Sequence, residues 1–454
     1  MHSRVEAGGC QRMGAGTRIA DWITTERSTF EERTPASAAL FRRASQVLPG
    51  GDTRYSLAMN PYPVYVERAA GTRLEDADGH RLLDLIYNAT SLIHGHVHPQ
   101  VTEAIRDQAG RATAVLAPNT VQIDLAEELC ARVPSLDRLR FTNSGTEATM
   151  MMIKTARAYT GRDLVLKMDG SYHGTFDGME INAATPGSER GAPYTAGVPA
   201  NLADNVVIGS FNDTDGVVSL IERYADRLAA VIVTPMASIA TWIPPAPGFL
   251  EAVRAAATAH GVLLLFDEVI AFRVAPGGAQ QRYGVTPDLT AYGKVIGGGM
   301  PVGAYGGRVD VMAVTDAAGG PRLAHAGTFN GNPVTAAAGL ATLRLLDADA
   351  YPRLERLGER FASRLRGAFA DLDLALEVRQ VGSLVSVATT ERTPAAWGEV
   401  NAAMRLALLN RGVCGWGVFA LPTVFDDAEI DEAVEIIHDA LRVPAAALHE
   451  VPVG

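Results

Sequence analysis

The 454-residue sequence has few cysteines and no long hydrophobic run. Its three cysteines, Cys10, Cys130 and Cys414, are an odd number and lie far apart, which argues against a disulfide framework and a zinc site. This usage favours a reducing compartment, and we expect a cytoplasmic protein. The longest apolar runs, such as 229–233 and 262–266, have about five residues and are too short for a signal-peptide core or a membrane span.

Clusters of basic residues are absent as well. The 40 Lys and Arg residues are outnumbered by 51 Asp and Glu residues, which gives a formal net charge of −11. This balance argues against nucleic acid and anionic lipid as partners, so we expect small-molecule substrates. The hydrophobic content of 47% excludes a disordered or collagen-like chain, and the length allows about two or three domains.

Short hydrophobic segments alternate with helical ones between about 160 and 310. The predicted strands are 164–168, 206–209, 229–233 and 262–266. Residues 249–260 have apolar positions at helical spacing, and Gly261 follows where a helix C-cap is expected. Repeated strand–helix–strand units predict an α/β fold with a mainly parallel, helix-covered sheet. Chemistry in such sheets collects at the carboxyl ends of the strands.

The flanking segments predict a smaller α+β domain built from both chain ends. Its predicted elements are a hairpin in 62–86 with its turn around 76–79, helices starting at 334 and spanning 351–372, a strand at 381–388 and a helix at 427–441. The predicted divisions are a loosely ordered tail (1–36), the first part of the small domain with a linker (37–110), the large domain (111–335) and the rest of the small domain (336–454).

A polar turn before the helical segment 148–159 is the first candidate site. Ser144, Gly145 and Thr146 would place backbone N–H groups and two hydroxyls at a helix N-terminus, which suits a phosphate. The alternative is a plain N-cap in which Ser144 or Thr146 only satisfies the helix end.

Asp267 directly follows five apolar residues, at the mouth of a predicted buried strand. An unpaired buried carboxylate is costly, so Asp267 needs a cationic partner or a hydrogen bond. One candidate partner is Arg273, in a structural salt bridge. The functional candidate is the nitrogen of a pyridinium ring, whose positive charge the carboxylate would hold.

Lys294 lies among apolar residues and glycines. Loss of solvation disfavours its ammonium form and makes the amine a better nucleophile for a carbonyl. The alternative is a surface lysine beside a flexible loop.

Tyr172 and His173 follow the predicted strand 164–168. Tyr172 offers a flat ring for stacking and His173 a polar edge; the alternative is that both side chains only pack in the core. A phosphate cradle, a carboxylate, an aromatic ring and an isolated lysine together are typical of a pyridoxal-phosphate (PLP) site.

These residues resemble the class III aminotransferases of PLP fold type I, from about residue 38 to residue 441. Within this family, the sequence most resembles the branch that contains glutamate-1-semialdehyde aminomutase and the β-phenylalanine-type aminotransferases. The stretches that carry the resemblance are 48–54, 76–79, 95–96, 141–148, 172–174, 266–269, 293–299 and 327–333.

The resemblance implies a role for each matching residue. Lys294 would form the Schiff base with the cofactor and later shuttle protons, and Asp267 would bind the pyridine nitrogen. Val269 and Tyr172 would cover the two ring faces. Ser144, Gly145 and Thr146 would hold the phosphate, and Thr328 would reach it from the neighbouring subunit of a homodimer.

The implied function is an aminotransferase that moves an amino group between a carboxylate-bearing amine, such as a β-amino acid, and a keto acceptor. Arg54, after the Pro-Gly-Gly turn, is the candidate clamp for the carboxylate, with a surface arginine as the alternative. An aminomutase or epimerase acting on one substrate skeleton is the alternative activity. A noncatalytic binding protein on the same scaffold is the rival from another class.

Some positions depart from the family pattern. Ornithine- and GABA-type enzymes have a glutamate that controls the use of two substrates and a glutamine after the aspartate motif, and Ile239 and Ile270 stand at these positions. An apolar residue at Ile270 is also typical of the aminomutase branch. Thr234 stands before Pro235 where many members have glutamate. A second carboxylate-binding arginine has no match in 412–420, so the amino acceptor stays open. We expect His94 to be a hydrogen-bonded structural histidine. Trp416 either forms a wall of a hydrophobic pocket or only packs in the core.

Overall fold

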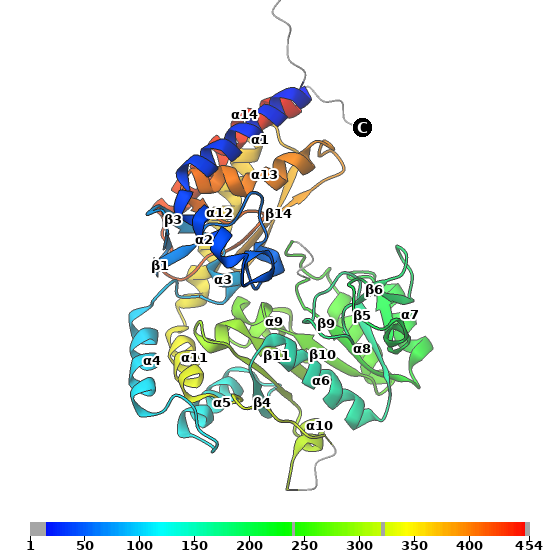
Figure 1. Ribbon diagram of the computed structural model, residues 1–454. Helices are drawn as coiled ribbons and strands as arrows, with labels where there is room; N and C mark the ends of the chain where they lie inside the picture. The colour runs from blue at the N-terminus through cyan, green and yellow to red at the C-terminus, as the bar shows by residue number, and fades with distance from the viewer. Residues whose placement is uncertain (1–14, 238–240, 319–322, 450–454) are drawn as a thin grey trace, which may run out of the picture.

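The computed structural model describes residues 15–237, 241–318 and 323–449. A seven-stranded sheet runs through the lower part of the molecule in Figure 1. In spatial order its strands are β4 (Arg138–Thr142), β12 (Gly303–Gly307), β11 (Leu289–Gly293), β10 (Leu263–Asp267), β9 (Leu228–Val233), β5 (Leu164–Met168) and β8 (Val206–Gly209). All pairs from β8 to β11 are parallel, and β12 is antiparallel to both of its neighbours. The predicted mainly parallel sheet is therefore confirmed.

Successive side chains of the central strands face two different helical layers. Leu263 and Leu265 of β10 pack with α6 (Gly145–Thr160), whereas Leu264 and Phe266 pack with α7 (Thr214–Tyr224) and α8 (Phe249–Ala259). Because side chains alternate along a strand and both faces are covered, a buried strand reads as a continuous apolar run. This is why the central strands could be predicted to within one residue of their observed ends.

Other helices surround the end of the sheet that carries β4. They are α4 (Pro99–Arg111), α5 (Thr120–Arg132), α9 (Gly278–Tyr283), α10 (Val309–Met312) and α11 (Pro333–Leu345). Leu125 and Leu129 of α5 pack with Ala336 and Leu340 of α11 in one buried cluster. A separate hairpin, β6 (Ile181–Ala183) with β7 (Gly191–Pro193), lies near β8.

The upper part of the molecule in Figure 1 combines both chain ends. One sheet has the order β1 (Val66–Ala70), β2 (Arg73–Asp76), β3 (Arg81–Asp84) and β15 (Val413–Cys414), and another has the order β13 (Leu376–Val381), β14 (Leu384–Thr389) and β16 (Val418–Ala420). The helices are α1 (Ala15–Arg33), α2 (Pro35–Ala44), α12 (Ala350–Asp371), α13 (Trp397–Asn410) and α14 (Asp427–Leu448). Parallel pairing of β15 with β3 joins the two chain ends directly. The boundaries at 110 and 335 stay a prediction.

The expected loose tail 1–36 is wrong for its described part. Residues 15–33 form α1, which lies against α13 and α14 (Figure 1). Ile19 and Trp22 are buried in the same core cluster as those helices, and Glu26 pairs with Arg411 at 2.8 Å. The charged residues between them hid this apolar face from the sequence analysis. Residues 1–14 lie outside the described part.

Two further predictions need correction. The segment predicted as one strand, 381–388, is part of the hairpin of β13 and β14, because Gly382 takes a left-handed φ of 61° at the turn. The predicted hairpin in 62–86 contains three strands, β1 to β3. Its turn is where it was expected, with Asp76 Oδ1 accepting hydrogen bonds from the backbone N–H groups of Asp78 and His80.

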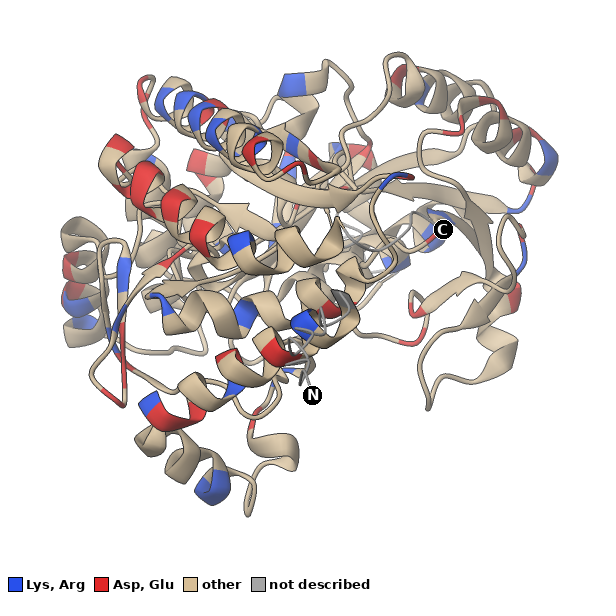
Figure 2. Ribbon diagram, turned by 90° about the horizontal axis from the view of Figure 1, so that it is seen from above, with Lys and Arg blue, Asp and Glu red and all other residues tan. Residues whose placement is uncertain are grey.

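Acidic and basic residues are interspersed along the outer helices in Figure 2. Within the described ranges, no helix combines the length and the apolar character that crossing a membrane requires.

Candidate active site

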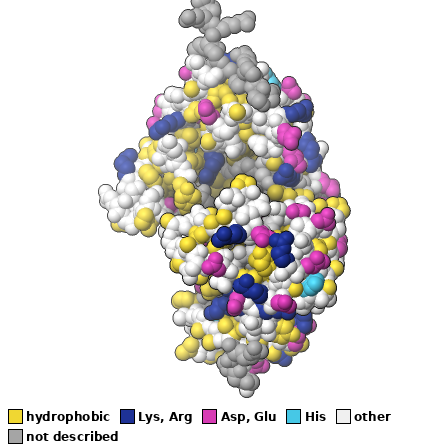
Figure 3. All heavy atoms as spheres, turned by 90° about the vertical axis from the view of Figure 1, so that its right-hand side faces the viewer, with side chains coloured by type: hydrophobic (Ala, Val, Ile, Leu, Met, Phe, Trp, Pro, Cys, Tyr) yellow, Lys and Arg dark blue, Asp and Glu magenta, His cyan; other side chains and the backbone are white. Residues whose placement is uncertain are grey.

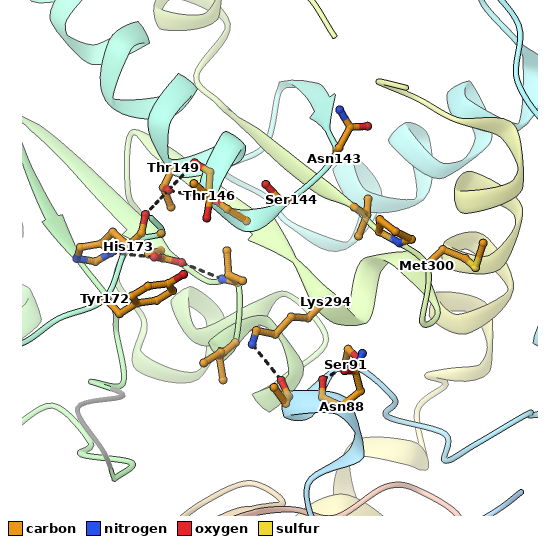
Figure 4. Close-up of a pocket in the computed structure, with 18 of the residues that line it drawn as sticks. Asn88, Ser91, Asn143, Ser144, Thr146, Thr149, Tyr172, His173, Lys294 and Met300 are labelled. Carbon is orange, nitrogen blue, oxygen red and sulfur yellow. Dashed lines mark hydrogen bonds and ion pairs between the residues drawn. The ribbon is translucent and has the colours of Figure 1, made fainter. Parts of the chain in front are cut away.

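A cavity of about 440 Å³ lies at the carboxyl ends of the parallel strands. β4, β5, β10 and β11 each lead into a segment that lines it, as expected for a sheet of this kind. The opposite side is formed by Arg54, Asn88, Ala89 and Ser91 from the upper part of the molecule. Figure 3 shows the molecule hollowed between its upper and lower parts, and Figure 4 shows the cavity side chains.

The start of α6 forms one end of the cavity. Ser144 is the N-cap, and its Oγ accepts a hydrogen bond from the backbone N–H of Glu147 at 3.1 Å. Gly145 and Thr146 line the cavity together with Ser144. The first backbone N–H groups of a helix have no acceptor within the helix, so they are available to a ligand. A Cβ at Gly145 would lie 2.9 Å from Val269 Cγ1, so the backbone is close to this side chain. The N-cap and the anion-binding hypotheses are therefore compatible.

Asp267 ends β10 with its carboxylate buried in the cavity floor. Its Oδ2 lies 2.8 Å from His173 Nδ1, and its Oδ1 accepts the backbone N–H of Val269 at 3.1 Å. Burial lowers the pKa of His173, so a neutral imidazole donates from Nδ1 and leaves the negative charge of the carboxylate uncompensated. The alternative salt bridge to Arg273 does not form, because that guanidinium donates to Thr90, Ser383 and Leu421.

Lys294 follows β11 and extends into the cavity (Figure 4). Its Nζ donates a hydrogen bond to the backbone carbonyl of Ala89 at 3.0 Å. Burial lowers the pKa of Lys294, the carboxylate of Asp267 opposes this shift, and the positive charges of Arg273 and Arg54 reinforce it. An amine in this environment is available as a nucleophile and as a base.

Lysine is scarce in this chain, a signal that the sequence analysis missed. The sequence contains only Lys154, Lys167 and Lys294. Lys154 is exposed on α6, and Lys167 is buried, with its Nζ donating to the carbonyls of Met179 at 3.0 Å and Ile181 at 2.7 Å. Lys294 is therefore the one lysine of the sequence that lines the cavity.

The upper side of the cavity could not be anticipated from the sequence, apart from Arg54. The Arg54 Nη1 donates to Asn88 Oδ1 at 2.8 Å. The turn Tyr87–Thr90, labelled α3, has φ values of 51°, 49°, 52° and 77°, all in the left-handed region. None of its residues is glycine, so no sequence signature marks this conformation.

The remaining predicted residues divide into two groups. Tyr172 and Val269 line the cavity, as do Ile270 and Thr234. Thr328 is exposed and is not among the residues that line this cavity. Ile239 lies outside the described residues.

Two residues have packing roles. His94 is buried, with Nδ1 at 2.8 Å from Thr423 Oγ1 and Nε2 at 3.0 Å from the carbonyl oxygen of Thr342. Trp416 packs near Trp397, and its Nε1 donates to Asn401 Oδ1 at 2.7 Å. The structural interpretation of His94 is therefore confirmed, and Trp416 belongs to the core.

The residues of the cavity fit PLP. The start of α6 offers N–H donors for a phosphate, and the close approach of Gly145 to Val269 leaves no room for a side chain there. A buried carboxylate with no cationic partner suits the ring nitrogen, and His173 Nε2 has no hydrogen-bond partner among the described residues. Fold and cavity together define an enzyme of PLP fold type I.

The chain belongs to the class III aminotransferase family, whose model matches residues 55–441. It is 40% identical over 376 residues to a glutamate-1-semialdehyde 2,1-aminomutase of Methanopyrus kandleri, which covers 82% of this chain and 87% of the relative. The resemblance found in the sequence is confirmed, and the cofactor is PLP.

Solved structures also resemble this fold. An omega-transaminase from Sphaerobacter thermophilus has a TM-score of 0.87 and 42% identity, covering 90% of this chain and 98% of that one. A transaminase with PLP bound has a TM-score of 0.88 and 37% identity, covering 92% and 99%. A β-phenylalanine aminotransferase from Variovorax paradoxus has a TM-score of 0.85 and 34% identity, covering 93% and 97%.

Proposed function

We propose that this enzyme moves an amino group on a substrate that carries one carboxylate. The observation that carries the proposal is the position of Lys294, whose Nζ lies in a cavity shared with Asp267 and the start of α6, opposite Arg54. Membership of a PLP-dependent family disfavours the noncatalytic alternative.

The cofactor contacts follow from the residues around the cavity. Ser144, Gly145 and Thr146 would hold the phosphate, and Asp267 the ring nitrogen. Val269 and Tyr172 would cover the two ring faces. When bound, PLP supplies an electron sink that stabilises negative charge at the substrate carbon.

The side chains of this enzyme have separate roles in the proposed reaction. Lys294 would hold the cofactor at its carbonyl carbon, and its amine would move a proton at the substrate carbon. His173 orients Asp267, whose negative charge would favour the protonated form of the ring nitrogen. Arg54 pairs with the substrate carboxylate, because a guanidinium offers two parallel N–H donors to it. Among the described lining residues it is the single arginine.

The relatives favour an aminomutase, the reaction in which the amino group stays within one substrate skeleton. The sequence alone favours transamination, with the aminomutase as the alternative. Six relatives, at 39–43% identity, are glutamate-1-semialdehyde aminomutases. A cavity with one arginine suits a single carboxylate-bearing skeleton. An epimerase has no support among these relatives.

Transamination is the second candidate. It is favoured by the likeness to the omega-transaminase and to the β-phenylalanine aminotransferase. A β-amino acid is then the candidate donor, and the amino acceptor would be a keto compound.

A homodimer in the cytoplasm is part of the proposal. Asn119 Nδ2 donates to the carbonyl of Gly331 at 3.0 Å, which brings the start of α5 beside the segment that carries Thr328. Leu116, Ile123 and Phe329 on these segments are exposed, and a second copy would cover them. Thr328 would then reach the phosphate of the partner subunit.

A single-turnover experiment tests the function. Enzyme in its pyridoxamine form is mixed with glutamate-1-semialdehyde, and enzyme in its PLP form with β-phenylalanine, without any second substrate. An isomer of glutamate-1-semialdehyde, of equal mass and with the amino group on the neighbouring carbon, supports the aminomutase. A keto product from β-phenylalanine, with the amino group retained on the cofactor, supports transamination. If neither product forms, both candidate functions are contradicted.

A further inference from the structure

We propose that the left-handed turn Tyr87–Thr90 aligns the carboxylate-binding side chain with the cavity lysine, and that Arg273 holds this turn in place. The inference rests on the proposed function, because it takes Arg54 as the group that binds the substrate carboxylate. It assigns positioning roles to Asn88, to the backbone of Ala89 and to Arg273.

The conformation of the turn has to be held by its surroundings. Successive left-handed residues that are not glycine are sterically unfavourable. Asp84 Oδ1 accepts the backbone N–H groups of Ile86 at 2.8 Å and Tyr87 at 3.1 Å, and Thr90 N–H donates to the carbonyl of Ile86 at 2.9 Å. The ring of Tyr87 is fully buried. These contacts fix the start of the turn.

Arg273 fixes its end. The guanidinium is buried, and Nη1 donates to the carbonyl of Thr90 at 2.9 Å. Nη2 donates to the carbonyl of Leu421 at 2.8 Å and to Ser383 Oγ at 3.0 Å. No ion pair to Arg273 occurs within the described ranges. The Arg273 side chain thus joins the turn to the hairpin of β13 and β14. A lysine cannot reproduce the forked geometry of the guanidinium.

The turn contacts both cationic side chains that the proposed reaction uses. The Ala89 carbonyl accepts a hydrogen bond from Lys294 Nζ at 3.0 Å (Figure 4). Asn88 Oδ1 accepts a hydrogen bond from Arg54 Nη1 at 2.8 Å. Asn88 Nδ2 is itself held by Ser91 Oγ at 3.1 Å. Because these contacts come from adjacent residues of one turn, the distance between the amine and the guanidinium is set by a rigid element.

The amide of Asn88 suits this role better than a carboxylate would. An amide oxygen accepts one N–H of Arg54 without neutralising the guanidinium, so the other N–H groups stay available for a substrate carboxylate. Asparagine also tolerates left-handed backbone angles better than most residues.

Two aminooxy probes measure the alignment in the holoenzyme without knowledge of the substrate. Aminooxyacetate and methoxyamine both react with the carbonyl carbon of the cofactor and release Lys294, but only aminooxyacetate has a carboxylate. The readout is the ratio of their second-order rate constants, followed by the loss of visible absorption. We expect aminooxyacetate to react about tenfold faster or more with the wild type.

Variants of Asn88 test the contact to Arg54. Asn88→Gly keeps the left-handed backbone and removes the side chain, and should lower the ratio about threefold or more, with the methoxyamine rate nearly unchanged. Asn88→Asp should lower the ratio further, because a carboxylate would neutralise Arg54.

Variants of Arg273 test the support of the turn. Arg273→Lys should lower the ratio by about threefold although this residue does not line the cavity. In the cofactor-free protein it should also speed amide hydrogen exchange in residues 87–92. Arg353→Lys is the matched control, since Arg353 donates to the carbonyls of Thr423 and Phe425 outside the turn, and it should change neither measurement. A merely structural role would lower the folded fraction without changing the ratio.

The outcomes separate this inference from the proposed function. If Arg54→Gln lowers the ratio while Asn88→Gly and Asn88→Asp leave it unchanged, the inference about the turn is overturned and Arg54 remains the clamp. If Arg54→Gln itself leaves the ratio unchanged, the carboxylate part of the proposed function fails. Should Arg273→Lys not fold, the two Asn88 variants still decide whether the turn aligns Arg54 with the cavity lysine.

Discussion

The two sides of the cavity are built in different ways. The strand-end side, which comprises Ser144–Thr146, Asp267 and Lys294, consists of residues at or just after the carboxyl ends of β4, β10 and β11. The turn side, which comprises Arg54 and residues 87–91, depends on an unusual backbone conformation and on contacts from distant segments. The strand-end side suits a cofactor that is shared by a whole family. In the proposed function the turn side faces the substrate, so substrate choice is expected to depend on it.

The largest effect is expected for Lys294→Ala on the strand-end side. Loss of the amine removes the group that binds the cofactor carbonyl and moves the proton, so amino-group transfer should fall by at least about 10³-fold. Product formation with the substrate found in the single-turnover experiment measures it. Lys154→Ala, on the exposed face of α6, is the control and should keep full activity. Equal losses in both variants would show that Lys294 has no special role.

Asp267→Asn should come next. An amide cannot hold the ring nitrogen in its protonated form, so kcat should fall by about 10²- to 10³-fold while the protein stays folded. Steady-state kinetics and circular dichroism together measure this. Asp288→Asn is a control, because this buried carboxylate pairs with Arg254 and Arg308 instead. A full kcat in Asp267→Asn would contradict the assigned role.

His94, which follows the turn side in the sequence, allows a test of stability against pH. Burial lowers the pKa of His94 from 6.5 to about 4, so its contribution to stability is present above pH 6.5 and is lost as the pH falls towards 4. Between pH 7 and 4, His94→Gln should lose roughly 3 kcal/mol less unfolding free energy than the wild type.

Urea unfolding across this pH range measures the difference. His260→Gln is the control, since His260 lies at the end of α8 away from the cavity, and it should follow the wild type. If His94→Gln and the wild type lose the same stability, His94 is not buried in its neutral form.

The smallest effect is expected for Gly145→Ala. A Cβ there would lie 2.9 Å from Val269 Cγ1, so the start of α6 and Val269 must move apart and cofactor affinity should fall by about tenfold. Titration of the cofactor-free protein with PLP measures the affinity. Gly367→Ala on α12 meets no atom within 4 Å and should leave it unchanged. An unchanged affinity in Gly145→Ala would mean that the cradle is not tight.

Most of the strand-end side could be predicted from the sequence, because each functional residue follows a recognisable apolar run or polar turn. Asp267 after 262–266 is the plainest example. The partner of Asp267 was missed, since nothing in the local pattern distinguishes His173 from Arg273. Only the fold brings the imidazole to 2.8 Å from the carboxylate.

The turn side could not be predicted beyond Arg54. Four non-glycine residues with positive φ have no compositional signature, and Arg273 reaches Thr90 across 183 positions of sequence. The packing of α1 was missed for a related reason, because its apolar positions gain meaning only once α13 and α14 are folded against it.

The most direct test of the central claim is borohydride reduction of the PLP-loaded enzyme followed by peptide mass spectrometry. With only three lysines in the chain, the assignment is unambiguous. The account predicts a pyridoxyl adduct on the peptide that contains Lys294. An adduct on Lys154 or Lys167, or none at all, would contradict it.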